Sequence, residues 1–111
     1  VVQAVSRVAG VLRPGVTADD VVRHLHPGGS VTGAPRPAAL EFIARLEDGP
    51  RGAYCGTLGV VAGGFARYAL LIRTAFRHAP GAWTYGVGAG ITWNSVAATE
   101  LEELRMKLRA L

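Results

Sequence analysis

The stretch that most constrains this chain is a glycine- and proline-rich run that leads directly into a helical pattern, Pro27-Gly28-Gly29-Ser30-Val31-Thr32-Gly33-Ala34-Pro35-Arg36-Pro37. Its glycines permit positive φ angles, and its last two prolines pre-set φ for a first helical turn. Apolar residues then recur at helical spacing and predict a helix over residues 37–47. A helix N-terminus offers unpaired N–H groups that suit a carboxylate or phosphate, while a simple capped turn is the alternative interpretation.

Three further helices are predicted from spacing and capping residues. Valines and a leucine over residues 2–12 recur at helical spacing, and the turn at Pro14-Gly15 ends that segment. Thr17 is a typical N-cap for a helix over residues 18–26, with acidic residues in its first turn. Asn94-Ser95 is expected to cap a last helix over residues 96–111, in which leucines form an apolar stripe.

Between the last two helices the period of the apolar residues changes from helical to alternating. Alternation over residues 66–77 predicts a strand with arginines on one face. A strand over residues 54–62 precedes it across Gly63-Gly64, and another over residues 83–91 follows a turn at 79–81. The sequence therefore predicts an α+β fold in which helices flank an antiparallel three-stranded meander.

The third predicted strand has one face almost without side chains, because Gly86, Gly88 and Gly90 alternate along it. Glycine weakens a strand, so a close approach by another group is the natural compensation. Contact with a ligand and tight packing of a second sheet are both open interpretations.

Composition sets the broad class of the protein. A chain of 111 residues can bury one modest core, and no apolar run is long enough to cross a membrane, so we expect no membrane partner. The net charge of +4 comes with scattered arginines and no interleaved aromatic residues, so we expect no nucleic-acid partner either. We see no secretion signal, and one cysteine, Cys55, cannot form an internal disulfide, which favours a cytoplasmic location.

Several blocks, in order, resemble the C-terminal half of the chorismate-binding domain. They are G-S-V-T-G-A-P at 29–35, R-G-A-Y-C-G at 51–56, I-R-T-A at 72–75, G-A-G-I-T-W at 88–93 and E-L-E-E-L-R-M-K-L at 100–108. The family includes aminodeoxychorismate synthase component I, anthranilate synthase component I, isochorismate synthases and salicylate synthases. The Y-C-G and I-T-W blocks look most like aminodeoxychorismate synthase component I.

The resemblance implies a fold and an activity. The family fold is a large two-sheet sandwich with helices outside, and residues 1–111 would be its C-terminal portion. The first residue is Val1 and the only methionine is Met106, so we expect a fragment that is inactive alone, with the catalytic groups upstream of Val1. The implied reaction replaces the hydroxyl at carbon four of chorismate by an amino group, on the way to 4-aminobenzoate and folate. A glutamine amidotransferase partner would supply the ammonia.

Two other interpretations of the function remain open. Anthranilate synthase component I, which aminates carbon two, or an isochorismate or salicylate synthase is the alternative within the family. A truncated remnant without catalytic activity is the alternative of another class.

The resemblance also implies site residues. The substrate-binding positions of the family fall on Ser30, Tyr54, Arg73, Gly88, Ala89, Gly90 and Lys107. Its magnesium-ligating glutamate falls on Glu103, with Glu100 one turn away, so Mg²⁺ is the implied cofactor. From the residues alone, Arg73 could grip a carboxylate in bidentate fashion, and two carboxylates make half of a hard-cation site. A solvated ion pair between Glu103 and Lys107 is the alternative for the last helix. We expect Arg73, Tyr54 and the backbone of residues 88–90 to converge on one pocket beside the N-terminus of the helix at 37–47.

Overall fold

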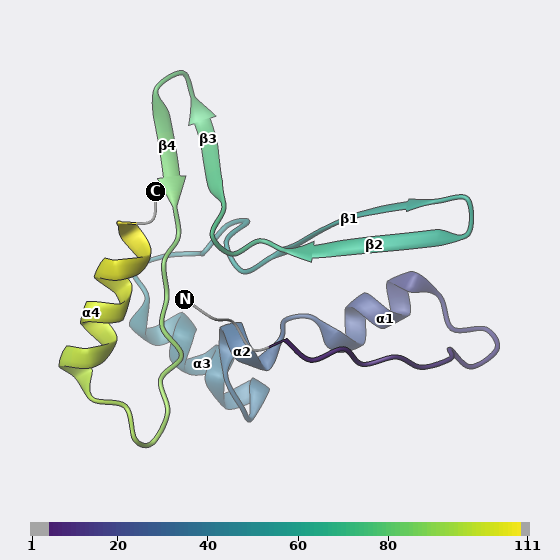
Figure 1. Ribbon diagram of the computed structural model, residues 1–111, viewed down its shortest axis with the longest axis horizontal. Coiled ribbons are helices and arrows are strands. Elements are labelled where there is room, and N and C mark those ends of the chain that lie inside the picture. The colour runs from purple at the N-terminus through teal and green to yellow at the C-terminus, as the bar shows by residue number, and fades with distance from the viewer. Residues whose placement is uncertain (1–4, 110–111) are drawn as a thin grey trace.

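The computed structural model describes residues 5–109, and its order of elements is α+β as predicted (Figure 1). Helices come first, two β-hairpins follow, and a helix ends the described part of the chain. The elements are α1 (Ala18–Leu25), α2 (Gly29–Thr32), α3 (Arg36–Leu46), β1 (Thr57–Ala62), β2 (Phe65–Leu70), β3 (Ala75–Ala79), β4 (Ala82–Tyr85) and α4 (Ala97–Leu108). No helix within these residues is long and apolar enough to cross a membrane.

The helix predicted over residues 2–12 is wrong for its described part, because residues 5–12 contain no helix. Residues 2–4 lie outside the described residues. The valines of this segment are almost fully exposed, for example Val8 at 94% and Val11 at 98%. β-Branched residues are weak helix formers, and an apolar stripe stabilises a helix only when it packs against something. Here the stripe has no partner surface.

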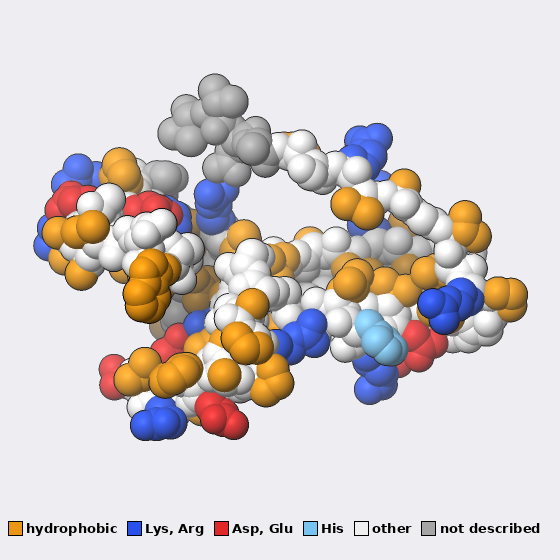
Figure 2. Space-filling model, turned by 90° about the horizontal axis from the view of Figure 1, so that it is seen from below, with side chains coloured by type: hydrophobic (Ala, Val, Ile, Leu, Met, Phe, Trp, Pro, Cys, Tyr) orange, Lys and Arg blue, Asp and Glu red, His pale blue; other side chains and the backbone are white. Residues whose placement is uncertain are grey.

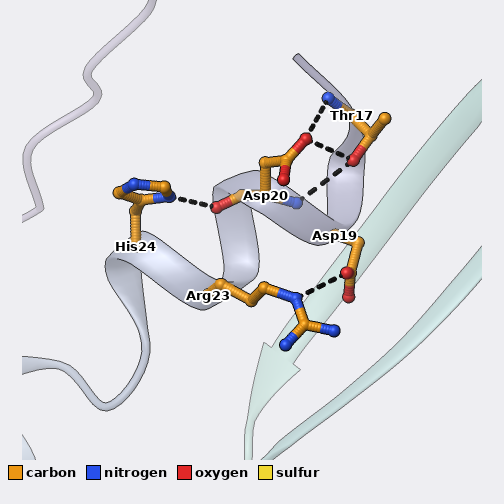
Figure 3. A network of polar contacts seen from close by, with 5 residues as sticks. All are labelled: Thr17, Asp19, Asp20, Arg23 and His24. Carbon is orange, nitrogen blue, oxygen red and sulfur yellow. Dashed lines mark hydrogen bonds and ion pairs between the residues drawn. The ribbon is translucent and has the colours of Figure 1, made fainter.

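Helix α1 confirms the prediction for residues 18–26, and Thr17 is its N-cap. The Thr17 hydroxyl accepts a hydrogen bond from the Asp20 amide at 3.2 Å, while the Asp20 carboxylate accepts one from the Thr17 amide at 2.9 Å (Figure 3). The two residues thus form a reciprocal capping box that satisfies two N–H groups at the start of the helix.

The glycine- and proline-rich run contains a helical turn that the sequence did not predict. Residues 29–32 form α2, and Gly33 ends it with a φ of 119°. The expected helix at 37–47 follows as α3, which begins at Arg36 with Pro37 in its first turn. The run is therefore a short helix, a glycine stop and a second helix.

The three-stranded meander is wrong. The predicted strand over 66–77 is divided between β2 and β3, which belong to separate two-stranded antiparallel sheets. The two hairpins point in different directions in Figure 1. The strand is interrupted at residues 71–74. Arg73 lies there with a left-handed φ of 51°, which a strand does not tolerate. Alternation continues through the break, so the pattern of apolar residues gave no sign of it.

The hairpin turns agree with the predictions, while the strands and the last helix are shorter than expected. Gly63 and Gly64 both have positive φ, as a tight hairpin of this kind requires, and Gly81 does so in the second hairpin. Strand β1 begins at Thr57 rather than 54, and β4 ends at Tyr85, so residues 86–91 belong to no strand. Helix α4 begins at Ala97 after Val96, and the predicted Asn94-Ser95 cap is wrong because the Ser95 hydroxyl accepts from the Thr92 amide instead.

Little of this chain is buried. Within residues 5–109 the single buried side chain is that of Cys55, which is 8% exposed. The radius of gyration is 16.5 Å, against about 13 Å for a compact chain of this length. Figure 2 shows apolar side chains spread over the open surface. The described helices and hairpins therefore do not pack around a continuous core.

Candidate functional site

A cavity of about 450 Å³ lies where α2, the end of α3, the break between β2 and β3, the segment after β4 and α4 meet. Its lining includes eight of the nine residues predicted to bind substrate or metal: Ser30, Tyr54, Arg73, Gly88, Ala89, Gly90, Glu100 and Lys107. Glu103 is the one that does not line it. The cavity lies beside Glu47 and Arg51 at the C-terminal end of α3, so the expected place at the N-terminus of that helix is wrong.

Tyr54 packs directly against the glycine-rich segment and lines the cavity with it. A turn that ends in a hydrogen bond from the Tyr54 amide to the Arg51 carbonyl, at 3.1 Å, places it. A Cβ added at Gly88 would lie 2.7 Å from the Tyr54 hydroxyl, and one added at Gly86 would overlap the ring itself. The group that approaches the face without side chains is therefore a tyrosine ring, which neither open interpretation of the sequence named.

The Tyr54 hydroxyl is held in its protonated form. Burial raises the pKa of Tyr54 above its ordinary value, and neighbouring Cys55 acts in the same direction. A protonated phenol can donate a hydrogen bond to an anion in the cavity at neutral pH.

Arg73 lies in the break between the hairpins, not on the face of a strand as predicted. The break is held by backbone hydrogen bonds from the Cys55 amide to the Leu71 carbonyl and from the Leu71 amide to Gly56, at 3.0 and 2.9 Å. None of the ion pairs formed within residues 5–109 involves Arg73. Its guanidinium is thus a cation at the cavity that those residues leave without a carboxylate partner.

Helix α4 joins the glycine-rich segment through Lys107. The Lys107 ammonium donates to the Gly88 carbonyl at 2.7 Å and pairs with Glu103 at 2.5 Å. The ion pair that was the alternative for this helix is therefore present, and it turns the Glu103 carboxylate toward Lys107. Glu100, one turn earlier, lines the cavity directly.

The donor set on α4 fits a hydrated magnesium ion only in part. Across residues 5–109 no group of three or more histidine, cysteine, aspartate or glutamate side chains is placed to hold a metal. Magnesium usually takes one or two carboxylates and keeps several waters. Glu100 and Glu103 could supply those two carboxylates, with the remaining ligands coming from water and a bound anion.

Two residues that line the cavity were missed from the sequence, Glu47 and Arg51. Arg51 stands inside the R-G-A-Y block, and Glu47 precedes it by four positions. An acidic and a basic residue four apart across the end of a helix is a recognisable signal for an ion pair. The predicted stop of the helix at 47 obscured it.

The chain is similar to known proteins over all or nearly all of its length. The sequence profile of the family described as "chorismate binding enzyme" matches residues 1–111. Anthranilate synthase component 1 of Aeropyrum pernix is 40% identical over all of this chain and 26% of its own length. Aminodeoxychorismate synthase of Streptomyces pristinaespiralis is 43% identical over 95% of this chain and 15% of its own length.

A third relative, 2-amino-4-deoxychorismate synthase of Streptomyces globisporus, is 39% identical over 99% of this chain and 22% of its own length. The chain thus spans about a quarter or less of the length of these relatives. No solved structure matches significantly. With its profile matched from end to end and relatives at about 40% identity, this chain belongs to the chorismate binding enzyme family.

Proposed function

We propose that residues 1–111 form the C-terminal, substrate-binding portion of a cytoplasmic enzyme that aminates chorismate at carbon four. The observation that carries the proposal is the single cavity in which a cation, a phenol, a glycine-rich backbone and a carboxylate meet. Chorismate is a dianion with two carboxylates. A site for it needs fixed donors for both, placed where water is partly excluded.

Each residue of the cavity has a role suited to its chemistry. Arg73 offers a planar fork that matches a carboxylate, and it has no ion-pair partner within residues 5–109. Tyr54 and Ser30 supply hydroxyl donors, and the backbone of Gly88, Ala89 and Gly90 supplies amides. Lys107 adds a second cation beside Gly88. The described residues lining the cavity thus offer donors for both carboxylates of the substrate.

Magnesium, held by Glu100 and Glu103, would neutralise a substrate carboxylate and favour departure of the hydroxyl. Its binding requires the Glu103 carboxylate to turn from Lys107, or to be shared with it. The groups that donate and remove protons belong, in this proposal, to the part of the enzyme before Val1. A glutamine amidotransferase would deliver ammonia.

Amination at carbon four is supported by the Y-C-G and I-T-W blocks and by one relative named aminodeoxychorismate synthase. Amination at carbon two is the second candidate, because relatives from Aeropyrum pernix and Pseudomonas putida are called anthranilate synthase component 1. The two differ in product, so the product decides between them.

The test uses the natural chain that carries these residues, supplied with chorismate, magnesium and ammonium, and follows the products by chromatography and mass spectrometry. We expect 4-amino-4-deoxychorismate. Anthranilate would assign the second candidate. A folded chain that leaves chorismate unchanged would contradict both and favour a remnant without activity.

The metal assignment has its own test. Glu103→Gln keeps the shape of the side chain and removes its charge, so we expect the magnesium concentration needed for half-maximal activity to rise about tenfold or more, as loss of a charged ligand implies. The matched control is Glu102→Gln on the same helix, where the carboxylate pairs with Arg105 in solvent. Equal magnesium dependence in all three proteins would mean that Glu103 serves only its ion pair.

A further inference from the structure

Arg51 makes hydrogen bonds to several parts of the cavity wall, and the proposed function gives it no role. Its Nε donates to both oxygens of Glu47, at 3.1 and 2.9 Å, and its Nη2 donates to the same carboxylate at 2.6 Å. Its Nη1 donates to the Val31 carbonyl at 2.7 Å. The guanidinium carbon also lies 5.9 Å from the centre of the Tyr54 ring. One side chain thus joins α2, the end of α3 and the tyrosine wall.

The bond to Val31 matters because α2 is a single turn. A helix of four residues has little stability of its own, and the last carbonyls of any helix lack partners within it. Arg51 supplies a partner for one of them from 20 positions further along the chain. Ser30, which precedes Val31, lines the cavity on this turn. Arg51 is thus hydrogen-bonded to the residue that follows Ser30 in this turn.

The pairing with Glu47 separates Arg51 from Arg73. Three hydrogen bonds to one carboxylate neutralise the Arg51 charge and fix the plane of its guanidinium. The Arg51 side chain is 24% exposed and that of Glu47 38% exposed, so solvent screens the pair only in part. Arg73 makes no such pair within residues 5–109. Arg51 is committed to the wall, while Arg73 is available to a ligand.

We infer that Arg51, oriented by Glu47, is a positioning residue that holds Ser30 and Tyr54 in place for the substrate without contacting it. This inference rests on the proposed function, because it takes chorismate as the substrate that the cavity binds. Arg51 and Tyr54 of the R-G-A-Y block thus have different roles. The bidentate ion pair with Glu47 orients the Arg51 guanidinium, and the guanidinium fixes α2 and the Tyr54 ring.

The test compares Arg51→Gln, Glu47→Gln and the double variant in the natural chain, with steady-state kinetics on chorismate. We expect Arg51→Gln to raise KM about tenfold with kcat changed less than about twofold, the size of a lost charge-assisted hydrogen bond. Glu47→Gln should raise KM in the same direction. The double variant should be no worse than Arg51→Gln, because both act through one unit.

The matched control is Arg105→Gln on α4, which breaks an exposed pair with Glu102 away from the cavity and should leave KM unchanged. If Arg51 only supported folding, its loss would lower the amount of active enzyme, and thus the apparent kcat, at unchanged KM. If Arg51 gripped the substrate, Glu47→Gln would free its guanidinium and lower KM. Either result overturns the inference.

A second measurement needs no substrate. In protein with ¹³C-labelled tyrosine, the ring resonance of Tyr54, assigned through Tyr54→Phe, should shift in Glu47→Gln and stay in place in Arg105→Gln. An unshifted resonance overturns the inference even if Arg51→Gln fails to fold. Absence of turnover by the wild-type chain would instead count against the proposed function, and the resonance would still report on Arg51.

Discussion

A tyrosine ring resting on glycines shapes one wall of the cavity. Tyr54 occupies the space that side chains at Gly86 and Gly88 would take. Neither glycine has a positive φ, so close approach rather than backbone conformation requires them. The two positions are thus constrained by packing against a single side chain.

Gly86→Ala is expected to displace the Tyr54 ring and to lower the free energy of unfolding by about 1–3 kcal/mol, the usual cost of overpacking. Thermal or denaturant unfolding measures it. Gly90→Ala is the matched control, since a Cβ there meets nothing within 4 Å and stability should hardly change. In a Tyr54→Ala background the penalty at position 86 should disappear. A penalty that persists would place its cause elsewhere.

Arg73→Ala is expected to raise KM for chorismate by about tenfold to a hundredfold, since a charged bidentate contact is commonly worth about 1.5–3 kcal/mol. Alanine at a φ of 51° is as strained as arginine, so the fold should be unaffected. Arg67→Ala on β2 is the control, because that arginine does not line the cavity. An unchanged KM in Arg73→Ala would make Arg73 structural.

The sequence brought together residues that also lie together in the structure, while the local structure around them was predicted less well. Resemblance over short blocks named Tyr54 and Lys107, and the structure brings both to the cavity, although their roles stay predictions. It did not name Arg51 or Glu47, whose importance depends on a carbonyl 20 positions away. The spacing of Glu47 and Arg51 could have indicated their ion pair, but the bond from Arg51 to Val31 joins distant segments and leaves no periodic trace in the sequence.

Among the elements, the capped helix α1 was predicted well and the strand ends were not. Thr17 marks the start of α1 by local hydrogen bonds that any chain with these residues can make. The division of residues 66–77 into β2 and β3 depends instead on Arg73 adopting a left-handed φ, with the break held by bonds to Cys55 and Gly56. Alternation describes which face a residue occupies but not which strand pairs with which.

The capping box of α1 gives a pH-dependent prediction. Hydrogen bonds from Thr17 lower the pKa of Asp20 below its ordinary value. A depressed pKa in the folded state means that this stabilisation is fully present above the ordinary aspartate pKa and is lost as pH falls through the lowered one. Thr17→Val, which keeps the shape and removes the hydroxyl, should raise the pKa of Asp20 in a carboxyl ¹³C NMR titration.

The matched variant is Thr99→Val within α4, whose hydroxyl takes no part in the cap and should leave the titration of Asp20 unaltered. An Asp20 pKa that is equal in wild type and Thr17→Val would show that the network in Figure 3 does not persist in solution.

At the scale of the whole molecule, much of the apolar surface of the described residues is exposed to solvent. Trp93 is fully exposed, and both strands of the first hairpin carry large apolar side chains in solvent. A single modest core was expected from the length, and the described residues bury almost none. Composition predicts how much apolar surface a chain has, but it does not predict how much of that surface the chain buries.

A polypeptide of residues 1–111 alone is therefore expected to bind a hydrophobic dye strongly, to bind magnesium weakly and to convert no chorismate. Two carboxylates on one helix do not make a tight magnesium site unaided, and exposed apolar patches of this kind bind dyes. Calorimetry, dye fluorescence and a turnover assay with ammonium measure the three. Measurable turnover would show that all catalytic groups lie within these 111 residues.

The bonds that close the cavity also bear on the order in which the chain folds. Lys107 reaches Gly88 across 19 positions and Arg51 reaches Val31 across 20, whereas each hairpin closes over two or so residues. Contacts across longer loops cost more chain entropy than these short hairpin turns. We expect the hairpins and α4 to be built before these two bonds join them, so that the cavity is the last feature to assemble.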